Sequence, residues 1–343
     1  MSAQRVLSEA TLPDYLRQIG VFEPWEAIRV EKAGDGNINW VRRVSSPGGR
    51  SFVVKQARPA LERFPQYSAD PARLIYEARY FERVRPFDRE RICPAVHGFQ
   101  EADRVLVLED LGDAERLDHL LDRGGDATPA ARALGAFLGR VHRATRDPAL
   151  AADFPNQAMQ RLHGDHIFRL PLEANDFPLS PALRARADAL CADTELRRIA
   201  SACYERFLTP RGALLHGDVQ AGNVLLAERG PVLLDAEIAH VGDPAFDVGT
   251  LLAHLALPAI ARGAPAAASP AVAAAFEAWS AAHGDPAPAR FAEVARYAGL
   301  ELLRRTIGAA RVPAAGDDQA ALRILDTAAR WIRTPAARPE ALV

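Results

Sequence analysis

The chain has 343 residues, of which 49% are hydrophobic and 25% charged, so it is long enough for two domains with a buried core. Its formal net charge of −2 excludes the strongly basic surface that attracts nucleic acids or anionic membranes. Three cysteines without a C-x-x-C pattern indicate free thiols, and a polar N-terminal sequence without a visible signal peptide predicts a cytoplasmic protein.

The first 108 residues combine strand-like and helical patterns. A helix is expected near the N-terminus, with Pro13 close to its start and Gly20 as a stop signal. Apolar runs separated by turn sequences such as Ser46-Pro47-Gly48-Gly49 indicate antiparallel strands. The expected elements are a helix over 10–20, strands over 27–30, 39–44 and 51–56, a helix over 71–85, and a strand pair over 95–100 and 104–108.

Helical patterns dominate after residue 109, apart from a turn-rich, strand-like region at 213–235. Helices are expected over 117–121, 128–145, 181–208 and from residue 245 onward, and the arrangement of residues 146–212 is left open. This order predicts an α+β protein with an N-terminal lobe (1–108), a hinge (109–112), a helical C-terminal lobe (113–333) and a loosely held tail (334–343). A ligand is expected at the break between the lobes.

A short polar loop carries the most specific pattern in the chain. Asp218 follows His216-Gly217, Asn223 comes five positions later, and Asp235 ends an apolar run downstream. A base followed by two metal-ligand positions is the set that ATP-dependent phosphoryl transfer needs, in the order that protein kinases use. The pattern therefore predicts a protein-kinase-like, two-lobed fold in which Asp218 orients the attacking hydroxyl and accepts its proton.

The predicted metal ligands are the oxygen-bearing side chains of Asn223 and Asp235, which suit Mg²⁺. Glu237, two positions after Asp235, is a further candidate ligand, and a plain exposed carboxylate is the alternative. His216 is expected to brace the loop by hydrogen bonds rather than to titrate.

Lys55 lies within an apolar strand and must therefore find a partner or reach solvent. We expect it to hold the α- and β-phosphates of ATP, fixed by Glu77 in the following helix. Glu82 on the same helix is the alternative partner. An edge-strand lysine that points to water would be the non-functional interpretation.

Two further segments are predicted to contact the nucleotide. Gly34-Asp35-Gly36-Asn37 lies between the first two strands, where glycines would let backbone N–H groups approach phosphate oxygens; an ordinary β-turn is the alternative. The hinge around Glu109 and Leu111 would offer backbone groups to the adenine edge.

The acceptor side is predicted from two arginines far along the chain. Arg304 and Arg305 lie in an otherwise apolar helix, where they are costly unless they meet anions or hydroxyl groups. Solvated guanidinium groups with buried stems are the alternative. Asp247 could hold the catalytic-loop backbone or simply cap a helix.

Together these motifs resemble the aminoglycoside phosphotransferase and choline kinase superfamily, and within it most closely the methylthioribose kinases. The similarity extends from about residue 25 to 312. It includes Gly34 to Asn39, Val54-Lys55-Gln56-Ala57, Phe154-Pro155-Asn156-Gln157, Asp235-Ala236-Glu237 and Leu303 to Ala310. The catalytic loop departs from the family pattern at Val219, Gln220, Ala221 and Asn223, and the family's tryptophan-bearing loop is replaced by Phe64-Pro65-Gln66-Tyr67.

The resemblance implies that Asp218 contacts a sugar hydroxyl, that Asp235 and Glu237 hold Mg²⁺, and that Arg304 and Arg305 line the sugar site and face the transferred phosphate. The expected activity is transfer of the γ-phosphate of ATP to the anomeric hydroxyl of 5-methylthioribose or a related 5-modified pentose. An aminoglycoside-, choline- or homoserine-type phosphotransferase is the alternative enzyme, and a nucleotide-binding pseudokinase the non-enzymatic alternative. No nucleic-acid or membrane partner is expected, and a homodimer is possible.

Overall fold

The computed structural model describes residues 4–33, 39–60, 69–284 and 288–342. The chain divides into two compact units, the first formed by Met1–Arg85 and Cys93–Asp113 and the second by Pro86–Ile92 and Ala114–Val343. Residues 86–92, which the sequence analysis placed in the first lobe, thus belong to the second unit. Backbone contacts explain this, because the carbonyl of Ile92 accepts a hydrogen bond from Leu233 N at 2.6 Å and that of Phe87 accepts one from Arg140 Nε at 3.1 Å.

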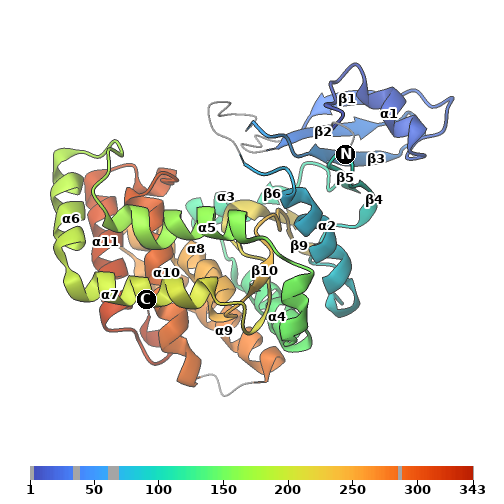
Figure 1. The fold of residues 1–343 in the computed structure, drawn as a ribbon. Helices are drawn as coiled ribbons and strands as arrows, with labels where there is room; N and C mark the ends of the chain where they lie inside the picture. The colour runs from blue at the N-terminus through green and yellow to red at the C-terminus, as the bar shows by residue number, and fades with distance from the viewer. Residues whose placement is uncertain (1–3, 34–38, 61–68, 285–287, 343) are drawn as a thin grey trace. The chain divides into compact units, whose positions relative to one another are not determined.

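The first unit contains a five-stranded antiparallel sheet with the strand order β1-β2-β3-β5-β4 (Figure 1). The expected first strand begins two residues later than the sequence indicated. The elements of this unit are α1 (Leu12–Gln18), β1 (Arg29–Lys32), β2 (Trp40–Ser45), β3 (Ser51–Gln56), α2 (Arg73–Val84), β4 (Val96–Gln100) and β5 (Val105–Glu109).

The two faces of this sheet have different partners because successive strand residues point to opposite sides. Val54 of β3 lies in a hydrophobic cluster with residues of α1, such as Leu12 and Leu16. Its neighbour Lys55 therefore points to the other face, where α2 packs on β4 and β5. The period of the strand thus directs Lys55 toward α2.

The second unit is mostly helical, with two small antiparallel sheets. Its strands are β6 (Glu115–Arg116), β8 (Val224–Ala227) and β9 (Gly230–Leu233) in one sheet, and β7 (Ala213–Leu215) and β10 (His240–Gly242) in the other. Its helices are α3 (Leu117–Asp122), α4 (Thr128–Ala144), α5 (Gln157–Gly164), α6 (Pro181–Ala192), α7 (Thr194–Leu208), α8 (Ala245–Ala261), α9 (Ser269–His283), α10 (Pro288–Ile307) and α11 (Asp318–Arg333).

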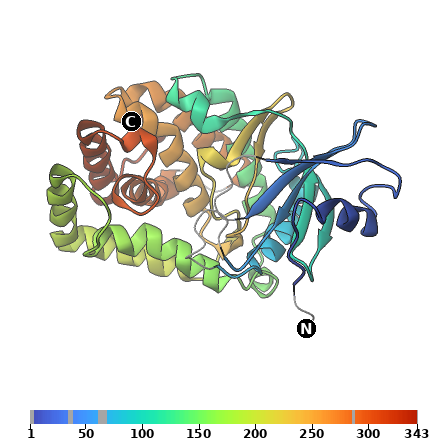
Figure 2. The ribbon, with the colours of Figure 1, turned by 90° about the horizontal axis from the view of Figure 1, so that it is seen from above.

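The core of the second unit is built around α8, which is buried along its whole length. Helix α8 packs against α9, α10 and α11, and Figures 1 and 2 show α8, α10 and α11 gathered together. The helical region expected over 181–208 is two helices, because the Asp193 side chain accepts a hydrogen bond from Leu196 N at 2.9 Å and starts α7.

The C-terminal end of the helical unit is held more firmly than the sequence indicated. The tail was expected to be loosely held, but Leu342 is buried and its carbonyl accepts a hydrogen bond from the Trp331 indole at 2.8 Å.

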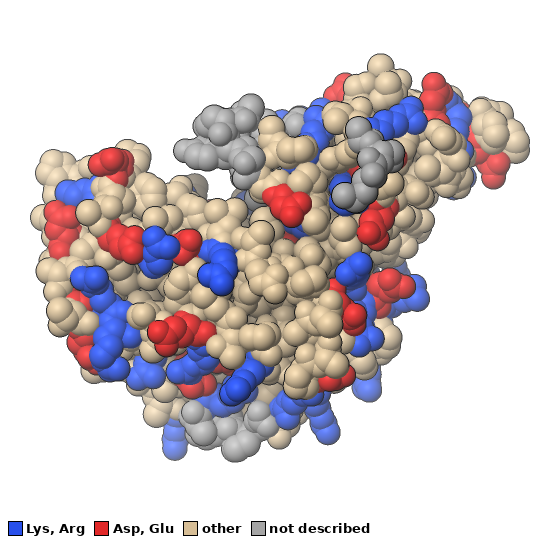
Figure 3. Space-filling model, in the orientation of Figure 1, with Lys and Arg blue, Asp and Glu red and all other residues tan. Residues whose placement is uncertain are grey.

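Within the described residues, no helix combines the length and apolarity needed to cross a bilayer. On the face drawn in Figure 3, acidic and basic side chains are interspersed.

Two glycines allow α4 to pack closely on α9. A Cβ atom added at Gly135 would collide with the backbone of Ala275, and one at Gly139 would collide with the backbone of Trp279. These obstacles are backbone atoms, so a larger residue cannot be accommodated by a rotamer change.

We therefore expect Gly139→Ala to lower the free energy of unfolding by about 1–3 kcal/mol through overpacking. Urea unfolding followed by circular dichroism measures the change. Arg132→Ala, at an exposed position of the same helix, is the matched control and should change stability by less than about 0.5 kcal/mol. Equal stability of the two variants would contradict close packing of α4 on α9.

Candidate active site

The loop from residue 216 to 223 leaves the end of β7, which pairs with β10 through the register Leu215↔His240. Asp247, in the first turn of α8, holds this loop by its backbone. Its two carboxylate oxygens accept hydrogen bonds from His216 N at 2.8 Å and Gly217 N at 2.9 Å. Of the two roles left open for Asp247, the structure favours support of the loop.

A chain of buried groups orients the Asp247 carboxylate. The Trp279 indole donates to His142 Nδ1 at 3.1 Å, which leaves the proton of the neutral imidazole on Nε2, 3.2 Å from Asp247 Oδ2. Burial opposes ionisation of Asp247, but this hydrogen bond and the nearby groups at His216 and Gly217 lower the pKa of its carboxyl. The sequence pattern did not indicate His142, because this residue lies 105 residues before Asp247.

Glycine is required at position 217 for two reasons. Its backbone has a φ of 86°, a conformation that L-residues with side chains rarely adopt. A Cβ atom would also lie 2.6 Å from the carbonyl oxygen of Ile238. The glycine therefore lets the loop turn sharply just before Asp218.

Asp218 lies within hydrogen-bond reach of two amide side chains of its own loop. Its Oδ2 accepts hydrogen bonds from Asn223 Nδ2 at 3.0 Å and Gln220 Nε2 at 2.9 Å. His216 Nδ1 accepts a hydrogen bond from Asp218 N at 3.3 Å, as the bracing role predicted. Burial lowers the pKa of His216, which keeps its ring neutral.

The β8–β9 hairpin brings Asn223 and Asp235 to the same end of a sheet. Val224 pairs with Leu233, and the carbonyl of Asn223 accepts a hydrogen bond from Leu234 N at 2.8 Å. Asp235 has a φ of 65°, the left-handed region that aspartate tolerates better than most residues. The hairpin thus brings Asn223 and Asp235, which are twelve residues apart in the sequence, to the same place in the fold.

The acidic strand end offers a pair of oxygen ligands. Carboxylate oxygens of Asp235 and Glu237 lie within 4.8 Å of each other, with Asp235 exposed and Glu237 buried. Asn156 Nδ2 donates to the carbonyl of Glu237 at 2.8 Å and that of Ala239 at 3.2 Å, which fixes the backbone around Glu237. Hard oxygen donors at this spacing fit a divalent cation such as Mg²⁺.

The twin arginines meet a buried carboxylate on their own helix. Glu301 Oε1 accepts from Arg305 Nε at 2.6 Å, and Glu301 Oε2 lies 3.2 Å from Arg304 Nη1. His254 Nε2 of α8 lies 3.1 Å from the same Oε1. Burial opposes ionisation of Glu301, but the two guanidinium groups and His254 keep its pKa well below the usual value. The apolar-helix pattern missed this partner, although its i, i+3 and i, i+4 spacing was visible.

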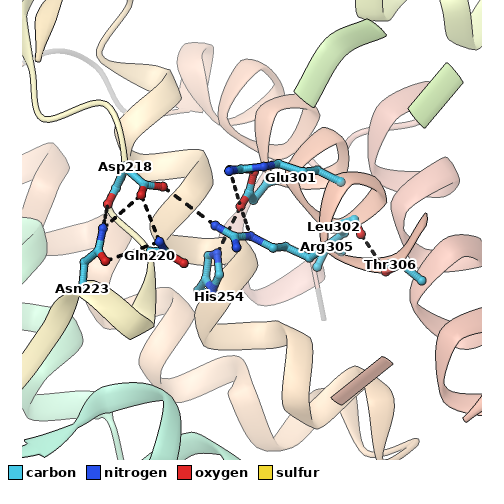
Figure 4. Close-up of polar contacts among 9 residues, drawn as sticks. Asp218, Gln220, Asn223, His254, Glu301, Leu302, Arg305 and Thr306 are labelled. Atoms are coloured by element: carbon cyan, nitrogen blue, oxygen red, sulfur yellow. Dashed lines mark hydrogen bonds and ion pairs between the residues drawn. The ribbon is translucent and has the colours of Figure 1, made fainter. Parts of the chain in front are cut away.

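Arg305 also links α10 to the catalytic loop. Figure 4 shows its guanidinium group between Asp218 and Glu301, and its Nη2 lies 3.8 Å from Asp218 Oδ1. The side chains of Arg304 and Arg305 are only 11% and 8% exposed, so they are not solvated arginines with buried stems.

This charge arrangement favours the ionised form of Asp218. Burial opposes ionisation, but His163 and the guanidinium groups of Arg304 and Arg305 lower the pKa of the Asp218 carboxyl. Burial keeps the pKa of His163 at about 3, so that ring is neutral at pH 7. The two arginines are therefore the positive charges that hold Asp218 ionised, and His163 is a neighbour that the sequence analysis did not identify.

In the first unit, Lys55 and Glu77 form a buried ion pair. Lys55 Nζ lies 2.7 Å from Glu77 Oε2, and both side chains are almost fully enclosed. This is the partner expected from the helix, in preference to Glu82. A fixed ammonium group on the α2 face of the sheet is the arrangement that holds phosphates in kinases.

Of the remaining predicted nucleotide contacts, the structure describes Glu109 and Leu111. Glu109 ends β5, where its N–H donates to Ala95 O at 2.9 Å and its carboxylate accepts from Ala95 N at 3.1 Å. Leu111, two residues on, is half-buried. Gly34-Asp35-Gly36-Asn37 lies outside the described residues.

Comparison with known proteins identifies a family and relatives of this chain. Residues 29–294 match the phosphotransferase enzyme family. A methylthioribose kinase from Cronobacter sakazakii is 32% identical over 75% of this chain and 67% of its own length. A methylthioribose kinase from Yersinia pseudotuberculosis is 30% identical over 91% of this chain and 86% of its own length.

Solved structures share the fold at lower sequence identity. An ethanolamine kinase from Plasmodium vivax has a TM-score of 0.57 at 10% identity, covering 98% of this chain and 93% of its own. A choline kinase from Streptococcus pneumoniae has a TM-score of 0.53 at 12% identity, covering 94% and 98%. These likenesses confirm the predicted kinase-like α+β fold.

Proposed function

We propose that this chain, which belongs to the phosphotransferase enzyme family, phosphorylates the anomeric hydroxyl of 5-methylthioribose or a related 5-modified pentose. As a member of that family it is a small-molecule kinase that uses ATP and a divalent metal. Membership in this family confirms the resemblance found in the sequence. The observation that carries the proposal is the Asp218–Arg305–Glu301 cluster in the second unit.

Asp218 is the proposed base of the reaction. The acceptor oxygen attacks the γ-phosphorus of ATP, the bond from that phosphorus to the bridging oxygen breaks, and ADP leaves. Asp218 orients the hydroxyl and takes its proton as the new bond forms. Its lowered pKa keeps it ionised and ready to accept that proton at pH 7.

The nucleotide side has two proposed parts. Lys55, fixed by Glu77, holds the α- and β-phosphates, with the Gly34–Asn37 segment and the backbone at Glu109 and Leu111 as further contacts. Asn223, Asp235 and Glu237 hold Mg²⁺, which neutralises phosphate charge when bound.

The charges around Asp218 favour a neutral acceptor. Two cations, Arg304 and Arg305, face two anions, Asp218 and Glu301, so this cluster is balanced without a ligand. The Glu301 carboxylate is already engaged by both arginines and His254. A cationic acceptor such as choline or an aminoglycoside would have to compete with Arg305 for Asp218, whereas a neutral sugar would not.

An acceptor panel tests the proposal. ADP release is measured with the purified protein, Mg²⁺-ATP and one acceptor at a time: 5-methylthioribose, 5-deoxyribose, ribose, choline, homoserine and kanamycin. We expect turnover with the 5-modified pentoses and a kcat/KM at least about a hundredfold lower with the cationic acceptors. Preferred turnover of choline or kanamycin would replace the pentose assignment, and ATP binding without any turnover would favour the pseudokinase.

The metal assignment has its own test. Asp235→Ala should remove the Mg²⁺ dependence of ATP binding together with most affinity for the metal complex, because it deletes a ligand with a hard oxygen atom. Titration calorimetry with and without Mg²⁺ measures this, with the exposed Asp326→Asn as the control. An Asp235→Ala protein that binds Mg²⁺-ATP like the wild type would refute the assignment.

A further inference from the structure

Glu301 is a buried carboxylate that three nitrogen donors hold in place. It lies on α10 and is 1% exposed. Its Oε1 accepts hydrogen bonds from Arg305 Nε at 2.6 Å and His254 Nε2 at 3.1 Å, the histidine donating because an ionised carboxylate only accepts. Its Oε2 accepts a hydrogen bond from Arg304 Nη1 at 3.2 Å. Because Glu301 is enclosed, it can influence the reaction only through these partners.

The hydrogen bond at Nε sets the direction of the Arg305 guanidinium group. This group is planar, so a partner that fixes Nε also limits where the terminal nitrogens lie. Nη2 lies 3.8 Å from Asp218 Oδ1 and has no hydrogen-bond acceptor of its own among the described residues. Figure 4 shows the guanidinium group between the two carboxylates. The position of Nη2 beside Asp218 therefore depends on the contact between Glu301 and Nε.

Helix α8 supports both the catalytic loop and Glu301. Asp247 in its first turn accepts hydrogen bonds from the backbone of the loop, and α8 also packs against α10. His254 follows Asp247 by about two turns, which places both residues on the same face of α8. One helix thus fixes the loop that carries Asp218 and the carboxylate that holds Arg305.

We propose that Glu301, held by His254, is a positioning residue that fixes the guanidinium group of Arg305 beside Asp218. The inference rests on the proposed function and adds to it two residues that act on the proposed base without touching the acceptor. A charged group that is already in place before the reaction needs no reorganisation at the transition state. If Glu301 only balanced the charge of the arginines, its loss would lower stability without a kinetic link to Arg305.

A double-mutant cycle with Glu301→Gln and Arg305→Ala tests the proposal. Glu301→Gln keeps the shape of the side chain but replaces one accepting oxygen with a donating amide group, which weakens its hold on the arginines. We expect kcat to fall about fivefold or more, with the KM for ATP within about twofold of the wild-type value. In the Arg305→Ala background the same change should lower kcat by less than about twofold, because no guanidinium group is left to position. Equal losses in the two backgrounds would overturn the inference.

Variants of His254 test the same contact without removing a buried charge. His254→Gln can place an amide donor near the Nε2 position, whereas His254→Phe keeps the ring shape and offers no donor. We expect kcat to fall about threefold or more in His254→Phe and to stay within about twofold of the wild-type value in His254→Gln. If His254 only stabilised the fold, His254→Phe would lower the melting temperature and leave kcat unchanged, a result that contradicts the proposal.

Glu293→Gln is the matched control on α10. Glu293 also forms an ion pair with an arginine, Arg206, but its side chain is 31% exposed and its partner lies on α7. The same chemical change there should leave kcat and both KM values close to those of the wild type. A loss of kcat as large as in Glu301→Gln would show that the loss of any ion pair on α10 impairs the enzyme, and the positioning role would be wrong.

The inference and the proposed function can fail separately. The kinetics are measured with the panel acceptor that turns over fastest, because the link between Glu301 and Arg305 does not depend on which hydroxyl is phosphorylated. If this acceptor is choline or kanamycin, the pentose assignment fails and the double-mutant cycle still decides the role of Glu301. If a pentose is phosphorylated but the two substitutions act independently, the function stands and the role of Glu301 is wrong. If no acceptor is turned over, both fail.

Discussion

Asp218→Asn is expected to reduce kcat by a hundredfold or more while ATP affinity stays close to that of the wild type. The amide can keep the contacts with Asn223 and Gln220, so the loop should hold its conformation, but it cannot accept the hydroxyl proton. Steady-state kinetics with the preferred acceptor, together with calorimetric ATP titration, measures the two parameters.

The control for this substitution is Asp326→Asn, which makes the same chemical change at a side chain that is 68% exposed. It should leave kcat and the melting temperature near the wild-type values. Wild-type kcat in Asp218→Asn would show that Asp218 is not the base, and the proposed mechanism would then have to be abandoned.

Arg305→Ala is expected to have the second largest effect, mainly on the acceptor side. Its guanidinium group connects Glu301 with Asp218. Its loss removes a positive charge next to the proposed base and takes one counter-ion from the buried Glu301 carboxylate. We expect at least a tenfold loss in kcat, about 1.4 kcal/mol in activation free energy. Arg304 pairs with Glu301, so Arg304→Ala should raise acceptor KM more than it lowers kcat.

The pH dependence gives an independent measure of the role of Arg305. The pKa of Asp218 is below its usual value in the folded protein, so Asp218 loses its charge, and activity falls, only as the pH drops through that lowered pKa. Without Arg305, burial should raise the pKa, and the acidic limb of kcat/KM should move to higher pH. Unchanged acceptor parameters and an unmoved acidic limb in both arginine variants would reduce these arginines to structural residues.

Local sequence patterns predicted many of the helices and strands. The β-like run Ser51–Gln56 predicted β3, and because successive strand side chains point to opposite faces, Lys55 lies on the face opposite Val54. The turns and helix signals predicted α2 and α4 to within about two residues. These features depend on neighbours in the chain, so their physical causes are visible without a structure.

The catalytic pattern was also recognisable from spacing alone. His216-Gly217-Asp218, Asn223 and Asp235 lie within twenty residues, and a loop followed by one hairpin brings them together. The family match confirms the kinase assignment that this spacing supported. The catalytic, nucleotide and metal roles of the individual residues stay predictions that the substitutions above can test.

Long-range contacts were decided only by the tertiary structure. His142 meets Asp247 across 105 residues, Asn156 meets the backbone of Glu237 across 81, and residues 86–92 join the second unit through contacts such as Ile92 with Leu233. In each of these contacts, the sequence pattern of one segment does not indicate which segment is its partner. Residues 165–169 are a further case, because only the fold brings this segment, which follows α5, against α10, the helix that carries Arg304 and Arg305.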